Sequence, residues 1–269
     1  MDRFVFTILG CGSSPGVPRI GNDWGACDPN NPKNERLRCS LMIERISENG
    51  AITSVLIDTT PDLRTQMLRE NIGHIDGVLY THGHADHIHG IDDLRGFWIK
   101  QRERINTYAN IKTTERLMEG FSYCFEQPSG SSYPPILNHH LIEAGKEVTI
   151  DGPGGAITAM PFDQTHGDIL SLGFRIRDFA YSSDLNALDE TAFNILSGVK
   201  IWIVDALRYN PHPSHFSVEE AIEAGRRVNA ARTIFTHMHI DLDYETLKRE
   251  LPEGFEPAYD GLKLEIPTY

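Results

Sequence analysis

The chain has 269 residues, and 25 lysines and arginines against 38 aspartates and glutamates give a formal net charge of −13. With 40% hydrophobic and 23% charged residues its composition is that of a globular protein, which excludes a largely disordered chain. No apolar run approaches the roughly 20 residues of a membrane span. The acidic balance disfavours non-specific binding to nucleic acid, because the phosphate backbone would be repelled.

Apolar runs in the first half predict strands over residues 4–9, 40–46, 54–58 and 77–81. We expect a short helix over 62–70, which Pro61 opens, and another from Asp86 onward. Residues 97–147 are less regular, with a helix-like run over 113–125 and a turn-rich stretch over 127–135. We interpret 97–147 as an insertion that could form a lid.

The second half predicts strands over residues 147–150, 156–161, 172–176, 179–182, 200–205 and 233–236. A helix is expected over 217–228, where Ser217 and Glu220 have the spacing of a capping box. No repeat and no long linker divides the chain, so we expect one domain over residues 1–269. Short strands alternating with helices favour an α/β sandwich whose sheets are both covered by helices.

The cysteines and histidines indicate the kind of chemistry. The four cysteines, Cys11, Cys27, Cys39 and Cys124, include no CxxC pair and suggest no disulfide framework, so we expect reduced thiols in a cytoplasmic protein.

Twelve histidines are more informative. Residues 82–87 read His-Gly-His-Ala-Asp-His directly after a buried strand. His82 and His84, two residues apart in an extended loop, face the same way and can bind one ion. Asp86 and His87 suit a second ion, and this ligand set favours zinc, iron or manganese.

The motif HxHxDH after a buried strand resembles the metallo-β-lactamase superfamily. The resemblance implies a four-layer αββα sandwich with its metal ions at one edge. It also implies three more ligands after strands: His166 with the first ion, Asp184 between both ions and His237 with the second. Asp58 matches the aspartate that supports the metal loop. The full set of implied ligands is His82, His84, Asp86, His87, His166, Asp184 and His237.

Several features resemble the phosphodiesterase branch of that superfamily. The segment 205–217 is similar to its downstream histidine motif, which implies that His215 protonates the leaving oxygen, with His212 as the competitor. Asp86 either binds an ion or orients the attacking water, and both roles stay open. The opening glycine loop, Cys27 and the segments 34–40 and 90–95 resemble phosphoribosyl cyclic phosphate phosphodiesterases, the PhnP-like branch.

One departure from that branch concerns a structural zinc. The branch holds this zinc with a cysteine cluster near residues 22–27 and a histidine after the final ligand. Here only Cys27 remains, with Asn22 and Trp24 at the other places, and His239 follows His237 by two residues rather than three. We therefore expect two divalent ions, zinc or manganese, and no structural zinc.

These features predict a metal-dependent phosphodiesterase for a small cyclic phosphodiester, such as phosphoribosyl cyclic phosphate or a nucleoside cyclic phosphate. The alternatives are a tRNA 3′-processing nuclease, a thioester or lactone hydrolase of the same superfamily, and a non-catalytic metal-binding module. The expected partner is a small phosphorylated substrate, without stable nucleic-acid binding or a membrane, and the sequence leaves room for a homodimer. The residues that we predict to contact substrate are Arg38, Arg95, Arg208 and His212.

Overall fold

A computed structural model describes residues 2–267. Within them, one sheet comprises β1 (Arg3–Gly10), β2 (Ser40–Ile46), β3 (Ile52–Ile57), β4 (Gly77–Leu79), β5 (Ile105–Ala109), β6 (Leu137–Leu141) and β14 (Lys263–Pro267). The other comprises β7 (Val148–Ile150), β8 (Ile157–His166), β9 (Ile169–Ile176), β10 (Phe179–Ser182), β11 (Ile201–Asp205), β12 (Arg232–Thr236) and β13 (Phe255–Pro257). Their strand orders are β14-β1-β2-β3-β4-β5-β6 and β13-β12-β11-β10-β9-β8-β7.

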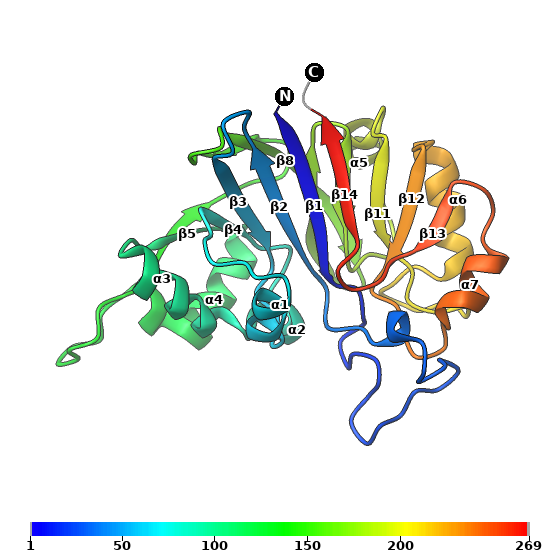
Figure 1. The fold of residues 1–269 in the computed structure, drawn as a ribbon, viewed down its shortest axis with the longest axis horizontal. Coiled ribbons are helices and arrows are strands. Elements are labelled where there is room, and N and C mark those ends of the chain that lie inside the picture. Colours follow the sequence, from blue (N-terminus) through cyan, green and yellow to red (C-terminus); the bar gives the residue numbers. More distant parts are fainter. Residues whose placement is uncertain (1, 268–269) are drawn as a thin grey trace.

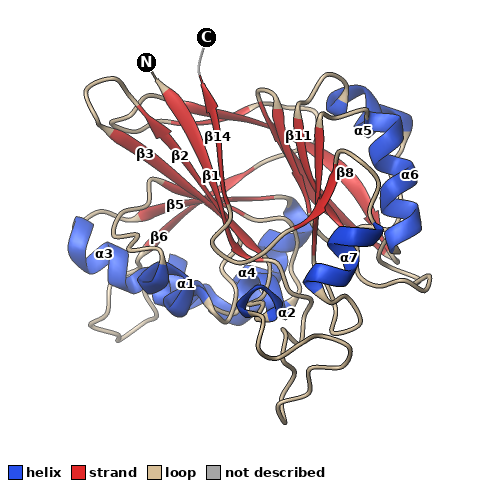
Figure 2. Cartoon of the chain, turned by 45° about the vertical axis from the view of Figure 1, so that its right-hand side comes forward, coloured by secondary structure: helices blue, strands red, loops and turns tan. Residues whose placement is uncertain are grey.

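Helices flank the two sheets on opposite sides (Figures 1 and 2). Those beside the first sheet are α1 (Leu63–Arg69), α2 (Ala85–Ile88), α3 (Arg95–Gln101) and α4 (Ile111–Phe125). Those beside the second are α5 (Glu190–Leu196), α6 (Val218–Val228) and α7 (Tyr244–Glu250). Short 3₁₀ turns occur at Pro32–Asn34 and Ile91–Leu94. This arrangement is the predicted αββα sandwich.

The alternation of side chains along each strand separates two apolar layers. In β2, Leu41 and Ile43 face the core between the sheets, whereas Met42 faces the helix layer outside. Phe6 and Phe179 stack between the sheets with their ring centroids 3.7 Å apart. Every one of these side chains is almost wholly buried, so removing apolar surface from water holds both interfaces together.

The topology brings several strand ends to one edge of the sandwich. Strand β3 runs parallel to β4, and β10, β11 and β12 run parallel to one another. Strand β8 is antiparallel to β9, which is antiparallel to β10, so β8 ends at the same edge as β10. The N-terminal loop 11–39 lies at the bottom of the molecule, where β1 ends (Figure 1). There Met238 N–H donates to the Cys11 carbonyl oxygen at 2.9 Å.

Most of the predicted elements are confirmed, including the capping box of Ser217 and Glu220 at the start of α6. Strand β8 is longer than predicted and reaches His166, because Thr165 and His166 pair with Leu170 and Ile169 of β9. The segment 97–147 differs most from the sequence interpretation. It places β5 and β6 in the first sheet, parallel to β4, and packs α4 beside them. Of segment 97–147, the part that extends outward from the body is the connection between α4 and β6 (Figure 1).

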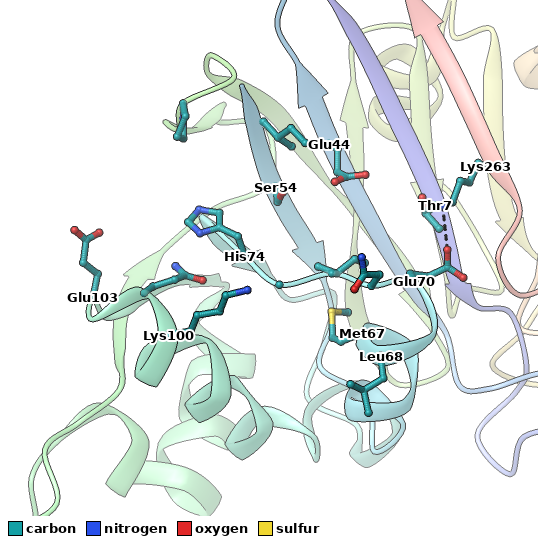
Figure 3. A pocket seen from close by; sticks show the side chains of 16 residues that line it. Thr7, Glu44, Ser54, Met67, Leu68, Glu70, His74, Lys100, Glu103 and Lys263 are labelled. Atoms are coloured by element: carbon teal, nitrogen blue, oxygen red, sulfur yellow. Dashed lines mark ion pairs between the residues drawn. The ribbon is translucent and has the colours of Figure 1, made fainter. Parts of the chain in front are cut away.

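A cavity of about 1,030 Å³ lies on the outer face of the first sheet. Figure 3 shows Thr7, Glu44 and Ser54 pointing into it from the strands, with the ion pair of Lys263 and Glu70 at one side. No histidine of the HxHxDH motif lines this cavity. Among the described residues, no helix is long and apolar enough to cross a membrane.

Candidate metal centre

The first group of predicted ligands converges on one point. His82 and His84 lie in the loop between β4 and α2, and His166 is the last residue of β8. One ring nitrogen from each can be chosen so that all three lie within 4.8 Å of one another. His84 Nδ1 and His166 Nε2 are 3.2 Å apart. The i and i+2 spacing therefore presents two imidazoles to the same side, as the sequence predicts, and the sheet edge adds the third.

The second group lies beside the first. Asp86 and His87 belong to α2, Asp184 follows β10 and His237 follows β12. Ligand atoms from these four residues also fall within 4.8 Å of one another. His237 Nε2 is 3.8 Å from Asp86 Oδ2. The structure thus brings together all seven residues that the resemblance implies as ligands.

Asp184 connects the two groups. Its Oδ2 is 3.9 Å from His82 Nε2 and 3.8 Å from His166 Nε2. The same oxygen is 3.3 Å from His237 Nε2, and Oδ1 is 3.2 Å from His87 Nε2. One carboxylate therefore faces both sets of imidazoles, which is the position that the sequence predicts for a bridging acid.

Neighbouring groups fix which nitrogen of three imidazoles faces the centre. His87 Nδ1 lies 2.7 Å from Asp58 Oδ2, and His166 Nδ1 lies 2.7 Å from the carbonyl oxygen of Ser214. His82 Nδ1 lies 3.0 Å from Thr81 Oγ1, which itself donates to Asp58. Each Nδ1 donates outward, so each Nε2 turns a lone pair toward the centre.

Several buried polar atoms at this point make no hydrogen bond of good geometry within the described residues, which fits a bound cation. His82 Nε2, His87 Nε2 and Asp184 Oδ1 are buried without a hydrogen-bond partner there, as are both ring nitrogens of His237. Buried polar atoms are ordinarily paired, and leaving one unpaired costs about 1–3 kcal/mol. Imidazole and carboxylate atoms that converge without partners are the donor set of a divalent transition-metal site. The residues present therefore fit the expected ions.

The protonation states also suit a cation. Burial lowers the pKa of His82, His84 and His166, which keeps these rings neutral and able to bind a metal. Burial opposes the charge on Asp184, but His237 and His87 hold its pKa well below the usual range. Burial also opposes the charge on His87, but Asp184, Asp86 and Asp58 raise the pKa of this ring well above its ordinary value. The carboxylates thus attract positive charge, and three of the imidazoles are neutral.

Three of these residues have left-handed backbone. Asp58, Asp184 and His237 have φ values of 63°, 53° and 58°. This conformation is uncommon outside glycine and costs of order 1–3 kcal/mol for each residue. Such strain persists only where the surrounding structure enforces it, and here each residue directs a polar side chain into or behind the centre.

His215 lies beside the second group and has a fixed orientation. Its ring stacks on His237 with centroids 4.6 Å apart, and its Nδ1 is 2.7 Å from Asp205 Oδ2. Burial lowers the pKa of His215 below its ordinary value. The sequence interpretation did not assign Asp205 a role. The sequence feature that could have indicated Asp205 is its position directly after the apolar run Ile201–Val204, at the end of β11. The predicted ligands His166, Asp184 and His237 also lie at strand ends.

The predicted substrate residues divide into two kinds. The His212 ring is 5.2 Å from the His215 ring, which places it at the centre. The three arginines already have protein partners: Arg38 bonds Asp62, Arg95 bonds Asp92 and Arg208 bonds the carbonyl oxygen of Pro211. Arg95 also lines a separate cavity with Tyr123 and Tyr133. A phosphate-binding role for these arginines stays a prediction.

Arg36 connects the N-terminal loop to the segment that follows β12. Its side chain is almost fully buried, and it donates to the carbonyl oxygens of Leu242 at 2.6 Å and His239 at 3.3 Å. Cys27 packs beside this guanidinium, and its Sγ is 3.4 Å from the carbonyl oxygen of Ile240. These bonds hold together the two segments for which the resemblance implies a structural zinc. The expected absence of that zinc stays a prediction.

Comparison with known proteins identifies relatives along nearly the whole chain. Residues 53–238 match the family model described as the β-lactamase superfamily domain. A crystal structure described as a new diphosphatase from the PhnP family is 37% identical, with 99% of this chain and 98% of that chain covered and a TM-score of 0.87. Zinc-bound PqqB from Methylobacterium extorquens is 18% identical, with 97% and 99% covered and a TM-score of 0.68, and shows the fold alone.

A longer protein is also similar. The octanoyltransferase of Porphyromonas gingivalis (strain ATCC BAA-308 / W83) is 30% identical over 262 residues, which are 95% of this chain and 50% of the relative. The chain therefore spans about half the length of this relative. The family model matches most of the chain, and the PhnP-family protein is similar in both sequence and structure. The chain therefore belongs to the metallo-β-lactamase superfamily and to its PhnP-like branch.

Proposed function

We propose that the protein is a dinuclear metal-dependent phosphodiesterase that cleaves a small phosphodiester, such as phosphoribosyl cyclic phosphate or a nucleoside cyclic phosphate. The observation that carries this proposal is the position of Asp184, whose carboxylate lies within 3.9 Å of histidines from both groups. Asp184 would be available to two cations, and a pair of cations suits in-line displacement at phosphorus.

Two divalent ions, zinc or manganese, would activate a water molecule and neutralise charge on the phosphoryl oxygens. The residues that would hold them are His82, His84, His166, Asp86, His87, Asp184 and His237. Hydrolysis consumes one water: an oxygen–phosphorus bond forms, the bond to the leaving alcohol breaks, and the alcohol oxygen takes a proton.

His215 supplies that proton in our proposal. Asp205 accepts from Nδ1, so Nε2 is the free ring nitrogen, and the stacking on His237 keeps it beside the ligands. A carboxylate behind the ring also stabilises the protonated imidazole that must form before the proton is given up. Asp205 is thus a positioning residue for His215, whereas Asp86 either binds an ion or orients the water.

Two relatives bear on the substrate class. The PhnP-family structure is described as a diphosphatase, which also cleaves a bond between phosphorus and oxygen. A diphosphate ester therefore belongs in the substrate panel. The octanoyltransferase name belongs to a protein of which this chain covers only 50%, so it does not assign acyl transfer to the part that is similar.

A substrate panel tests the proposal. The purified protein is loaded with zinc or manganese and offered bis-p-nitrophenyl phosphate, cyclic nucleotides, ribose cyclic phosphate, a diphosphate ester, a thioester, a lactone and precursor tRNA. We expect turnover of the small phosphodiesters, loss of activity in Asp184→Asn, and no loss in the matched control His140→Asn, whose histidine is exposed. Preferred turnover of the thioester, the lactone or the tRNA would overturn the assignment.

A further inference from the structure

A second cavity opens directly at the candidate metal centre. It has a volume of about 800 Å³, and both His82 and His84 line it. Its walls are the start of α4 on one side and the turn between β8 and β9 on the other. The loop of His82 and His84 lies against α4 closely enough that a Cβ on Gly83 would be 3.1 Å from Arg116 Cβ. The cavity is therefore continuous with the centre and large enough for part of a substrate.

The lining of this cavity is mainly aliphatic. Ile111, Leu141 and Leu170 expose 55%, 61% and 54% of their surface, although each is a large apolar side chain. Ile142 and Ile169 complete the same wall, and no aromatic ring other than the two histidines lines the cavity. Nucleobases are usually held by stacking on aromatic rings, so this lining does not suit a base. It suits a flexible hydrocarbon group.

The charged groups of the cavity disfavour a second anionic subsite. Lys112 pairs with Glu115 at 3.0 Å, and Arg116 pairs with Glu119 at 2.7 Å. Asp163 and Asp168 line the same cavity and add negative charge. A second phosphate or an RNA strand would meet acids here and would find both cations already paired. The lining therefore favours a substrate whose phosphate lies at the metal end and whose remaining group is uncharged.

From this continuity and chemistry we propose that the cavity binds an alkyl or acyl chain of the substrate. The substrate is then a phosphoric ester whose phosphate lies at the histidine cluster and whose hydrocarbon chain lies along Ile111, Leu141 and Leu170. This inference rests on the proposed phosphodiesterase function, and within that function it favours an ester with a hydrocarbon chain over the sugar and nucleoside cyclic phosphates named above. Burying hydrocarbon that would otherwise contact water supplies the binding free energy.

The test uses p-nitrophenyl phosphodiesters whose second group is methyl, butyl or octyl, together with thymidine 5′-p-nitrophenyl phosphate. Each fully buried methylene raises kcat/KM by about fourfold. With half of the added methylenes buried, the octyl ester exceeds the methyl ester by on the order of 100-fold. Equal kcat/KM values along the series, or a preference for the thymidine ester over the octyl ester, would overturn the proposal.

Variants locate the effect. Replacing Leu141 and Leu170 by serine should flatten the chain-length dependence, so that kcat/KM of the octyl ester falls toward that of the methyl ester. The matched control Leu68→Ser removes an equally exposed leucine, 64% accessible, from the cavity of Figure 3 and should keep the full dependence. A flat series in the control as well would mean that the effect does not arise in this cavity.

A binding measurement separates the two proposals. Titration calorimetry with monomethyl and monooctyl phosphate on metal-loaded and metal-free protein should show tighter binding of the octyl compound in both forms, and the serine variant should lose the difference. If no diester is hydrolysed but this difference remains, the phosphodiesterase proposal fails and the chain-binding cavity stands. If the diesters are hydrolysed without any difference, the reverse holds.

Discussion

Removing the carboxylate behind His215 is the most direct way to examine the proposed proton donor. Asp205 is fully buried, and its Oδ2 accepts from His215 Nδ1 at 2.7 Å and from Leu185 N–H at 3.0 Å. Asp205→Asn keeps the shape and one acceptor oxygen but replaces the other oxygen with an amide NH2. Burial raises the pKa of the wild-type Asp205 carboxyl well above its usual range, although His237 opposes this. A hydrogen bond to a charged group contributes about 1.5–3 kcal/mol, which corresponds to a loss of about 10- to 150-fold in kcat. His215→Ala should lose more, about 10²–10⁴-fold.

The assay compares two leaving groups on the same variants. An alkyl alcohol must be protonated as it departs, whereas p-nitrophenolate is stable as an anion, so both variants should lose far more activity toward the alkyl ester. The wild-type activity should fall as pH rises through the pKa of His215, which burial lowers below its ordinary value, because only the protonated ring can donate. Metal content and circular dichroism serve as checks on folding.

The proton-donor role of His215 can be contradicted by the same leaving-group comparison. Equal losses with both leaving groups would mean that neither residue takes part in proton transfer. His212→Ala is the matched comparison, because its ring is 5.2 Å from that of His215 and its Nδ1 already interacts with Ser214. If His212→Ala rather than His215→Ala caused the leaving-group effect, the roles of the two histidines would be exchanged.

Three further predictions concern the metal centre and the loop beside it. Removing the metal ions with a chelator should lower the melting temperature by on the order of 10 °C, because an ion at a thousand times its Kd stabilises the fold by about 4 kcal/mol. An unchanged Tm in calorimetry would count against a metal site formed by the folded chain. Asp58→Asn should weaken metal binding by about 10- to 100-fold in a chelator competition, since it removes the charge that orients His87 at 2.7 Å, and unaltered affinity would refute that role. Arg36→Met should lower the free energy of unfolding by about 3 kcal/mol in urea titrations, because the carbonyl oxygens of His239 and Leu242 lose their donor, whereas an unchanged midpoint would show that the loop needs no such bond.

Some elements of the fold could be predicted from the sequence, and others could not. The helices α1 and α6 were predictable because their start signals are local, as the capping box of Ser217 and Glu220 shows. Strands β5 and β6 were not, because Leu137–Leu141 is exposed at three of five positions and has no clear apolar alternation. Their strand conformation depends on pairing with β4 and β5, whose residues lie roughly 30 positions away in the chain.

The candidate site shows the same division. The sequence alone identified the HxHxDH loop, because its ligands are neighbours in the chain and two-residue spacing puts His82 and His84 on one side. The resemblance to the superfamily also implied His166, Asp184 and His237, each after a strand. Only the tertiary structure decided that Asp205 orients His215, that Arg36 joins loops about 200 residues apart in sequence, and that aliphatic side chains from α4, β6 and the β8–β9 turn form one cavity. Those relations arise from sheet topology, which brings distant segments to a common edge, and no local pattern of residue types encodes such a meeting.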